Sequence, residues 1–302
     1  MSALAGAQEV ADPGAAPEQE ETRKRGLVGY LLLLPGGLWL ALFFLVPTIT
    51  LVSTSLYDPS GSILDGYQMT FHFQNYLEAV QDYAVPFGRS LGYALIATVS
   101  CVLLGYPLAY AIAFKAGRWK NLMLILVVAP FFTSFLVRTL SWQLLLGDNA
   151  FAVQALRAIH VLGPEGHLLA TPFAVVTGLT YNFLPFMVLP LYASLEKIDG
   201  RLLEAGSDLY AAPFTVFRKV TLPLSMPGLV AGTLLTFIPA AGDYINSELL
   251  GTPQTRMIGN EIQDLFAAGS YPVAASLSVT LMAVIVVMVF VYVRRSGTED
   301  LV

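Results

Sequence analysis

The sequence has little charge and almost no cysteine or histidine. Only 12% of its 302 residues are charged and 56% are hydrophobic, whereas soluble domains carry roughly 25% charged residues. The single cysteine, Cys101, cannot form a disulfide within the chain, and the three histidines lack metal-ligand spacing. These shortages argue against a disulfide framework, a metal site and a disordered chain. The mean hydropathy of +0.66 instead indicates a polytopic membrane protein.

Motifs for nucleotide binding and catalysis are missing as well. The sequence contains no G-x-x-x-x-G-K-[ST] phosphate loop, no H-E-x-x-H motif and no Ser–His or Cys–His constellation. We therefore predict that the chain is not an enzyme and binds no cofactor of its own. We also expect no nucleic-acid partner.

Long stretches without charge predict membrane-spanning helices. Residues 26–57 contain no Asp, Glu, Lys or Arg, and a helix needs only about 20 residues to cross a bilayer. Five further stretches follow, one interrupted by Arg138, and none shows the strict alternation of barrel strands. The predicted fold is an all-α membrane protein with six transmembrane helices, at about residues 27–52, 90–114, 121–146, 170–195, 222–244 and 270–293.

Basic residues predict the orientation of these spans. Twelve of the 16 Lys and Arg residues lie before span 1, between spans 2 and 3, between spans 4 and 5, or after span 6. The positive-inside rule places these segments, and both termini, in the cytoplasm. Residues 1–25 are rich in Ala, Gly, Glu and Pro and are predicted to be a disordered cytoplasmic tail. Residues 26–295 form the membrane domain, and residues 296–302 a second cytoplasmic tail.

The loop between predicted spans 4 and 5 has the pattern of two short helices. The first, at about residues 199–209, places leucines on one side at helical spacing. Pro213 is suited to start the second, with Phe214 and Phe217 on one face, and Leu222-Pro223 is predicted to end it. An amphipathic pair at the cytoplasmic edge of the membrane needs a partner that covers its aromatic side chains.

Within this loop the chain resembles the permease subunits of bacterial binding-protein-dependent ABC importers. Their signature is Glu-Ala-Ala, three residues, Gly, nine residues, Ile, one residue, Leu-Pro. The corresponding residues here match without a gap: Glu204, Ala205, Gly206, Tyr210, Val220, Leu222 and Pro223. Gly206 replaces the second Ala, and Tyr210 replaces the Gly. Because that glycine usually serves a turn with positive φ, which is costly for tyrosine, we expect the turn to be shifted or reshaped.

The resemblance implies a mechanism and a set of partners. In that family the loop docks into a groove on an ATP-hydrolysing subunit, and closure of the ATPase dimer rocks two permease halves between outward and inward openings. A second permease, as a hetero-pair, and an extracytoplasmic substrate-binding protein complete the assembly in the bacterial plasma membrane. Glu204 is then part of the ATPase contact. The alternative is that Glu204 only caps or solvates a surface helix.

Several stretches resemble the spermidine/putrescine branch of the family, namely residues 130–138, Tyr181-Asn182 with Pro185, and residues 237–251. Asp243 and Glu248 have the charge to attract ammonium groups, and Trp142 and Tyr244 offer ring faces for cation–π contacts. Asn182 is a candidate for lining a cavity. The alternative remains open that both acids are interfacial and solvated, with one of them pairing Arg138.

Burying the charge of Arg138 inside a membrane span is energetically unfavourable unless the charge is paired or faces water. Arg138 is then either part of the translocation path or a structural charge that holds a neighbouring helix. Because it would repel a cationic substrate, we favour the structural interpretation. The resemblance to the spermidine/putrescine branch implies a polyamine permease subunit, and the apolar spans predict contact with membrane lipid. The alternatives are a permease for another small solute of the same importer family and an ATP-independent secondary transporter.

Overall fold

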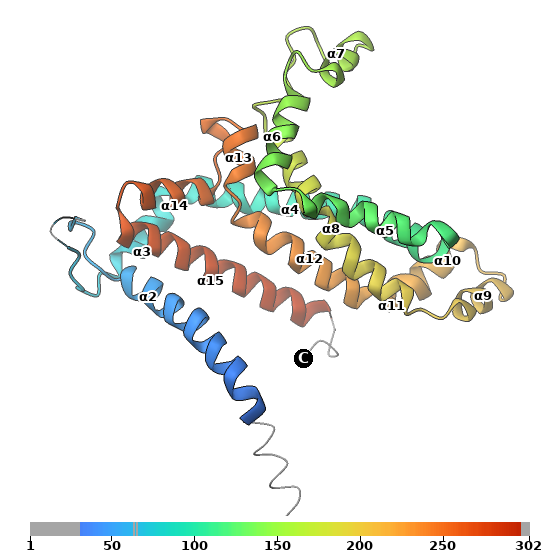
Figure 1. Cartoon of the computed structure of the whole chain (residues 1–302), viewed down its shortest axis with the longest axis horizontal. Coiled ribbons are helices and arrows are strands. Elements are labelled where there is room, and N and C mark those ends of the chain that lie inside the picture. Colours follow the sequence, from blue (N-terminus) through green and yellow to red (C-terminus); the bar gives the residue numbers. More distant parts are fainter. Residues whose placement is uncertain (1–30, 63, 65, 297–302) are drawn as a thin grey trace, which may run out of the picture. The chain divides into compact units, whose positions relative to one another are not determined.

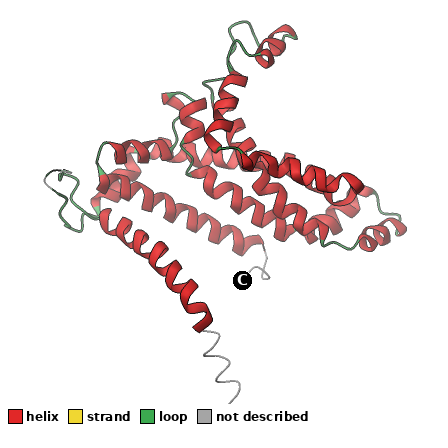
Figure 2. Cartoon of the chain, viewed as in Figure 1, coloured by secondary structure: helices red, strands yellow, loops and turns green. Residues whose placement is uncertain are grey.

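The computed structural model describes residues 31–62, 64 and 66–296. The predicted tail 1–25 and all but the first residue of the tail 296–302 lie outside the described residues. The chain divides into two compact units, Met1–Leu51 and Val52–Val302. Figure 2 shows helices joined by loops, and the described residues contain no strand beyond isolated bridges between Tyr57 and Met69 and between Ser62 and Gly66.

The described part of the first unit is helical. The described helix runs from Leu31 through a π turn, η1 (Ala41–Leu45), into α2 (Val46–Thr54). The rings of Trp39 and Phe43 lie 4.2 Å apart along it. Its 24 residues are long and apolar enough to cross a membrane, which agrees with the first predicted span.

The second unit is built around three long helices, α4 (Ala84–Tyr110), α8 (Pro172–Glu196) and α12 (Met226–Ala241), which pack against one another (Figure 1). One buried cluster lies around Leu179 and Phe237, and a second around Met187 and Leu191. The fourth long helix, α15 (Tyr271–Ser296), packs against α3 (Gln74–Asp82) and α14 (Ile258–Ala267). This bundle is the framework that positions both parts of the candidate site.

Shorter elements connect these helices. They are η2 (Ala111–Lys115), η3 (Gly117–Trp119), α5 (Lys120–Val128), η4 (Ala129–Phe132), α6 (Phe135–Leu146), α7 (Phe151–Ala158), α9 (Gly200–Asp208), α10 (Pro213–Val216), η5 (Phe217–Thr221), α11 (Leu222–Leu224), α13 (Ile245–Leu250) and η6 (Pro253–Thr255). Of these, η2 and η5 are π turns, whereas η3, η4 and η6 are 3₁₀ helices.

Two of the six predicted spans are bent. Four helices in the described part are individually long and apolar enough to cross a membrane, and the number reaches six if each bent pair of helices forms one span. The first pair, residues 117–132 and 135–158, bends by 97°, and the second, residues 213–224 and 226–241, bends by 67°. The segments predicted as spans at 121–146 and 222–244 each contain one of these bends.

The first bend has a local cause. Thr133 and Ser134 have extended backbone conformations, with ψ of 145° and 141°, so they separate η4 from α6. The Thr133 hydroxyl donates a hydrogen bond of 2.9 Å to the carbonyl of Pro130, which fixes the end of η4. Beyond the break, α6 packs along α13 and leads to α7 (Figure 1).

Candidate functional site

The loop that carries the family signature folds as two helices, close to the predicted bounds. Asp199 accepts a 3.0 Å hydrogen bond from the backbone N–H of Arg201, as an N-cap side chain does, and α9 follows from Gly200 to Asp208. Pro213 starts α10, as predicted. Glu204 and Ala205 are exposed on α9, Pro223 is exposed on α11, and Val220 and Leu222 are half-buried between them.

Tyr210 occupies the position of the signature glycine and adopts the glycine's conformation. Its φ is +56°, in the left-handed region that residues other than glycine and asparagine rarely enter. The N–H of Ala211 donates a 3.3 Å hydrogen bond back to the carbonyl of Gly206, the six-to-one bond of a Schellman motif. The expectation that tyrosine would shift or reshape the turn is therefore wrong. The strain stays in the turn, and the Tyr210 side chain is left 98% exposed.

Gly206, the second departure from the signature, allows α9 to approach α10 closely. A Cβ atom at this position would lie 3.0 Å from Cγ2 of Val216, whose side chain is buried. That separation is shorter than an ordinary van der Waals contact of about 3.5–4.0 Å. The usual alanine would require Val216 to move, so this chain packs its two loop helices more tightly than alanine permits.

Aromatic side chains connect the loop to α4. Phe217 meets Tyr106 edge-on, with ring centroids 5.4 Å apart, and lies 6.4 Å from Tyr110. On its other side it stacks on Phe214, which is 71% exposed. The hydroxyl of Tyr106 also forms a buried 2.7 Å hydrogen bond with that of Ser225. These contacts join the loop to the end of α4.

The Leu222-Pro223 pair does not end the second loop helix, contrary to the prediction. The helix runs from Pro213 through η5 into α11, and the bend comes at Ser225, between Leu224 and Met226. Pro223 is tolerated because it follows the π turn at the start of α11, where a missing N–H is least costly. The bend thus lies beside the Tyr106 hydroxyl.

A second part of the site is a buried polar network that joins α6, α8 and α13. The side-chain amide of Asn182 donates to the Thr139 hydroxyl at 3.2 Å and to Oδ1 of Asn246 at 3.1 Å. Asn246 in turn donates its backbone N–H and its side-chain amide to Oδ1 of Asp243, at 2.8 and 3.1 Å. Asp243 is only 8% exposed. Two of the predicted residues, Asn182 and Asp243, therefore meet through Asn246.

Gly178 makes this network possible. A Cβ atom there would lie 2.4 Å from Cδ1 of Leu250 and 2.6 Å from Oδ1 of Asn246. Real Cβ atoms do not approach other atoms so closely, so any larger residue would push α13 away from α8. The absence of a side chain at Gly178 is what brings Asn246 within reach of Asn182.

A neighbouring set of polar contacts holds Tyr244 and Glu248. The Asn260 amide donates to the carbonyl of Tyr244 at 3.1 Å and to Oε2 of Glu248 at 3.0 Å. Glu248 also lies 3.7 Å from Arg256, which pairs more closely with Asp264. Partial burial works against the charge of Arg256, but the hydrogen bond and charge of Asp264 raise its pKa above the ordinary value.

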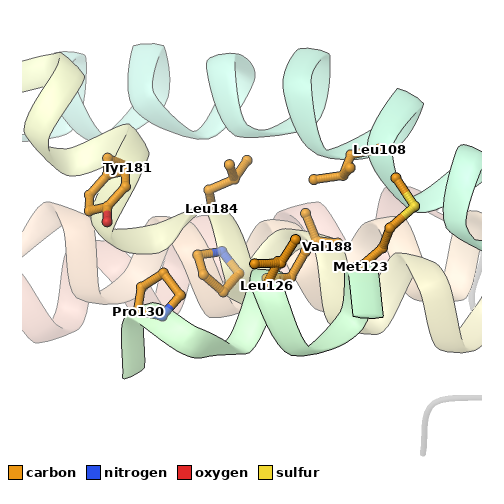
Figure 3. A pocket seen from close by; sticks show the side chains of 9 residues that line it. Leu108, Met123, Leu126, Pro130, Tyr181, Leu184 and Val188 are labelled. Carbon is orange, nitrogen blue, oxygen red and sulfur yellow. The ribbon is translucent and has the colours of Figure 1, made fainter. Parts of the chain in front are cut away.

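Trp142 and Arg138 lie apart from both networks. Trp142 packs edge-on against Tyr181, with ring centroids 5.4 Å apart, and both line a cleft of about 350 Å³ together with Arg138. Arg138 has no ion pair with Asp243 or Glu248, so the alternative that one of these acids neutralises it is wrong for the described residues. A second, apolar cavity of about 260 Å³ lies between α4, α5 and α8, and Tyr181 lines it as well (Figure 3).

Sequence reasoning missed three members of the polar networks, Thr139, Asn246 and Asn260. Thr139 and Asn246 follow predicted functional residues, Arg138 and Tyr244, within one or two positions. That proximity is the only signal in the sequence. Asn260 lies in a segment without a motif, and only the fold brings it to Glu248.

Comparisons with known proteins identify the family. Residues 102–296 match the family described as "Binding-protein-dependent transport system inner membrane component". The chain is 36% identical over 260 residues to the spermidine/putrescine transport system permease protein PotB of Haemophilus influenzae, which covers 85% of this chain and 90% of that protein. It is 27% identical over 269 residues to PotC, a permease protein of the same system in Escherichia coli, covering 85% of this chain and 91% of PotC.

The fold is similar to a solved transporter structure. A chain of a bacterial ABC transporter involved in the import of the acidic polysaccharide alginate superposes with a TM-score of 0.65. The match covers 94% of this chain and 99% of that chain at 17% sequence identity, so it bears on the fold alone. The family match spans well over half of the chain, and the PotB relative exceeds 30% identity over most of its length. The chain therefore belongs to the inner-membrane permease components of binding-protein-dependent ABC importers.

Proposed function

We propose that this chain is a permease subunit through which an ATP-driven importer moves polyamines into the cell by alternating access. The observation that carries the proposal is the loop of α9 and α10. Its exposed face carries Tyr210, Leu209 and Phe214, and its buried face is joined to α4 by aromatic contacts. A surface of this kind suits a subunit that docks on the loop and moves the helices behind it.

The partner that docks on the loop is proposed to be an ATPase dimer, since this chain has no phosphate loop. The proposed contact with the ATPase is made by the signature residues, and their match to the family signature supports it. These residues are Glu204, Ala205, Gly206, Tyr210, Val220, Leu222 and Pro223. Closure of the dimer would press on the face formed by Tyr210 and Phe214. Phe217 would pass that movement to Tyr106 and Tyr110 on α4.

The proposed cargo is supported by the spermidine/putrescine relatives and by Asp243. Both hydrogen bonds that Asp243 receives from described residues end on Oδ1. A polyamine ammonium group would pair with Oδ2, and the ring of Tyr244, which is partly exposed, would offer a cation–π contact. Glu248 supplies a second negative charge nearby, and Trp142 and Asn182 are the further candidates for the path.

A second permease subunit is proposed as the other half of the pathway. The chain is similar both to PotB and, more distantly, to PotC, two permease proteins named for one type of transport system. That pair of relatives favours a hetero-pair of permeases over a single one. An extracytoplasmic substrate-binding protein would deliver the polyamine, as the family's description implies.

The proposal is tested by purifying the tagged chain from its native membrane in mild detergent and identifying the stoichiometric partners by mass spectrometry. The complex is then reconstituted in liposomes, and uptake of radiolabelled putrescine and spermidine is measured with and without ATP. ATP-dependent uptake by a complex with an ATPase and a second permease supports the proposal. A chain that purifies alone and transports without ATP would establish a secondary transporter instead, and ATP-dependent uptake of a different solute would overturn the polyamine assignment.

The role of Asp243 is tested by Asp243→Asn. An asparagine can turn its carbonyl oxygen toward Asn246 and keep both hydrogen bonds, so the fold is expected to persist while the charge is lost. We expect the KM for polyamine uptake to rise about tenfold, since a hydrogen-bonded charge contributes about 1.5–3 kcal/mol. Unchanged uptake across a range of polyamine concentrations would remove Asp243 from the path.

A further inference from the structure

Arg138 is a buried cation whose guanidinium has no counterion among the described residues. The residue is 9% exposed, and its Nε and Nη1 atoms are buried without a hydrogen-bond partner. Its only described charge-related contacts are with two aromatic faces, those of Phe131 at 5.9 Å and Phe135 at 5.5 Å. A buried charge without a partner is strongly destabilising, so Arg138 needs an acceptor that the described residues do not supply.

The surroundings of Arg138 show where that acceptor enters. The cleft of about 350 Å³ beside the side chain is lined by Thr133, Ser141, Trp142 and Tyr181 among others. No carboxylate of the described residues forms an ion pair with Arg138: Asp243 accepts hydrogen bonds from Asn246, and Glu248 binds Asn260 and Arg256. Tyr181 lines both this cleft and the apolar cavity of Figure 3, whose other lining side chains are apolar.

The depth of Arg138 argues against a lipid phosphate as the acceptor. The nine residues of α5 and the four of η4 rise about 21 Å from Lys120, at about 1.5 and 2.0 Å per residue. The chain then turns by 97° into α6, so Arg138 stays near that depth. With Lys120 at the cytoplasmic edge of a hydrocarbon core about 30 Å thick, Arg138 lies within the core and away from the phosphates.

The remaining source is a neighbouring protein. The face of α6 next to Arg138 is apolar and exposed, with Leu136, Val137 and Leu140 on it, and Val137 also borders the cleft. We propose that this face of α6 packs against the second permease subunit and that an Asp or Glu of that subunit enters the cleft to pair with Arg138. The inference rests on the proposed function, which supplies the second permease subunit. The cargo itself cannot be the acceptor, because a polyamine has no carboxylate and would be repelled by Arg138.

The test uses the complete transporter, with this chain tagged and the second permease and ATPase co-expressed. Arg138→Glu is expected to reduce recovery of the second permease about tenfold or more, since removing one partner of a buried pair is strongly destabilising. Each membrane-embedded Asp or Glu of the second permease is then changed to Arg in the Arg138→Glu background. One such change is expected to restore recovery. Arg157→Glu is the matched control, because Arg157 pairs with Asp148 of this chain at 2.9 Å, and it should leave recovery unchanged.

Disulfide trapping provides a measurement that does not depend on the folding of an Arg138 variant. Cys101→Ala removes the native thiol, and Ser141→Cys places a thiol at the cleft. We expect a cross-link to a cysteine substituted at the restoring position of the second permease.

Full recovery with Arg138→Glu and no cross-link from Ser141→Cys would overturn the inference. Loss of bound anionic phospholipid, rather than of the second permease, would assign the acceptor to a lipid. If no second permease co-purifies with the tagged wild-type chain, the proposed function fails. If the wild-type complex is whole and insensitive to Arg138→Glu, only this inference fails.

Discussion

Replacing Tyr210 by glycine separates the two effects of this residue, the strain in the turn and the exposed ring. A left-handed conformation costs a non-glycine residue about 1–2 kcal/mol, and glycine's own flexibility costs about 0.5–1 kcal/mol. Because Tyr210 is 98% exposed, the substitution removes almost no contact within the chain. Tyr210→Gly should therefore stabilise the end of α9 by about 0.5–1 kcal/mol, which corresponds to a two- to fivefold change in local opening.

Hydrogen exchange of the isolated chain in detergent measures this change. The amide of Ala211, which donates to Gly206 at the end of α9, should become about two to five times better protected in Tyr210→Gly. Tyr210→Ala keeps the Cβ atom and the strain, so it should leave this protection unchanged. Reduced protection of Ala211 in Tyr210→Gly would refute the strain argument.

The same variants report on the ring when the ATPase is present. If the Tyr210 ring is covered by the ATPase, both Tyr210→Gly and Tyr210→Ala should weaken its binding by about 1–2 kcal/mol, or roughly 5- to 30-fold. The glycine variant would then have a more stable turn and a weaker complex. Equal ATPase binding by wild type and Tyr210→Ala would show that the ring stays outside the contact.

Three further substitutions test other contacts of the loop and the bundle. Gly178→Ala, whose Cβ would meet Leu250 and Asn246 at 2.4 and 2.6 Å, should lower stability by about 1–3 kcal/mol in detergent melting experiments. Gly92→Ala, which has open space, is its control, and equal melting of the two variants would contradict the steric argument. Glu204→Lys should insert normally but hydrolyse more ATP per polyamine imported, whereas Asp208→Lys on the same helix should not; identical ratios would remove Glu204 from the mechanism. Phe217→Ala breaks the ring contacts with Tyr106 and Phe214 and should retain ATPase binding while slowing uptake, and an unaltered uptake rate would mean that movement passes by another route.

The loop of α9 and α10 was largely predictable because its information is local. The spacing from Glu204 to Pro223, the start at Pro213 and the pairing of Phe214 with Phe217 all depend on neighbours in sequence. The conformation of Tyr210 was mispredicted for the opposite reason. Propensity disfavours tyrosine in that turn, but the helix end and the packing of Gly206 on Val216 determine the backbone there.

The polar networks and the broken spans could not be read from the sequence. Asn182, Asn246 and Thr139 come from three separate helices, and their contacts require the close approach that Gly178 allows. In the third predicted span, apolar character continues on both sides of Thr133 and Ser134. Hydropathy records how long an apolar stretch is and carries no sign of a 97° change in direction.

The two π turns of the second unit lie on either side of the same aromatic contact. η2 follows directly after Tyr110 on α4, and η5 begins with Phe217. A π turn accommodates one residue more than an α turn, and one residue corresponds to about 100° of helix rotation. If either π turn shifts along its helix when the loop is pressed, the segment that it crosses rotates by about that angle. The π turns at the junction between loop and bundle thus allow a small displacement of the loop to change which residues a helix presents to its neighbours.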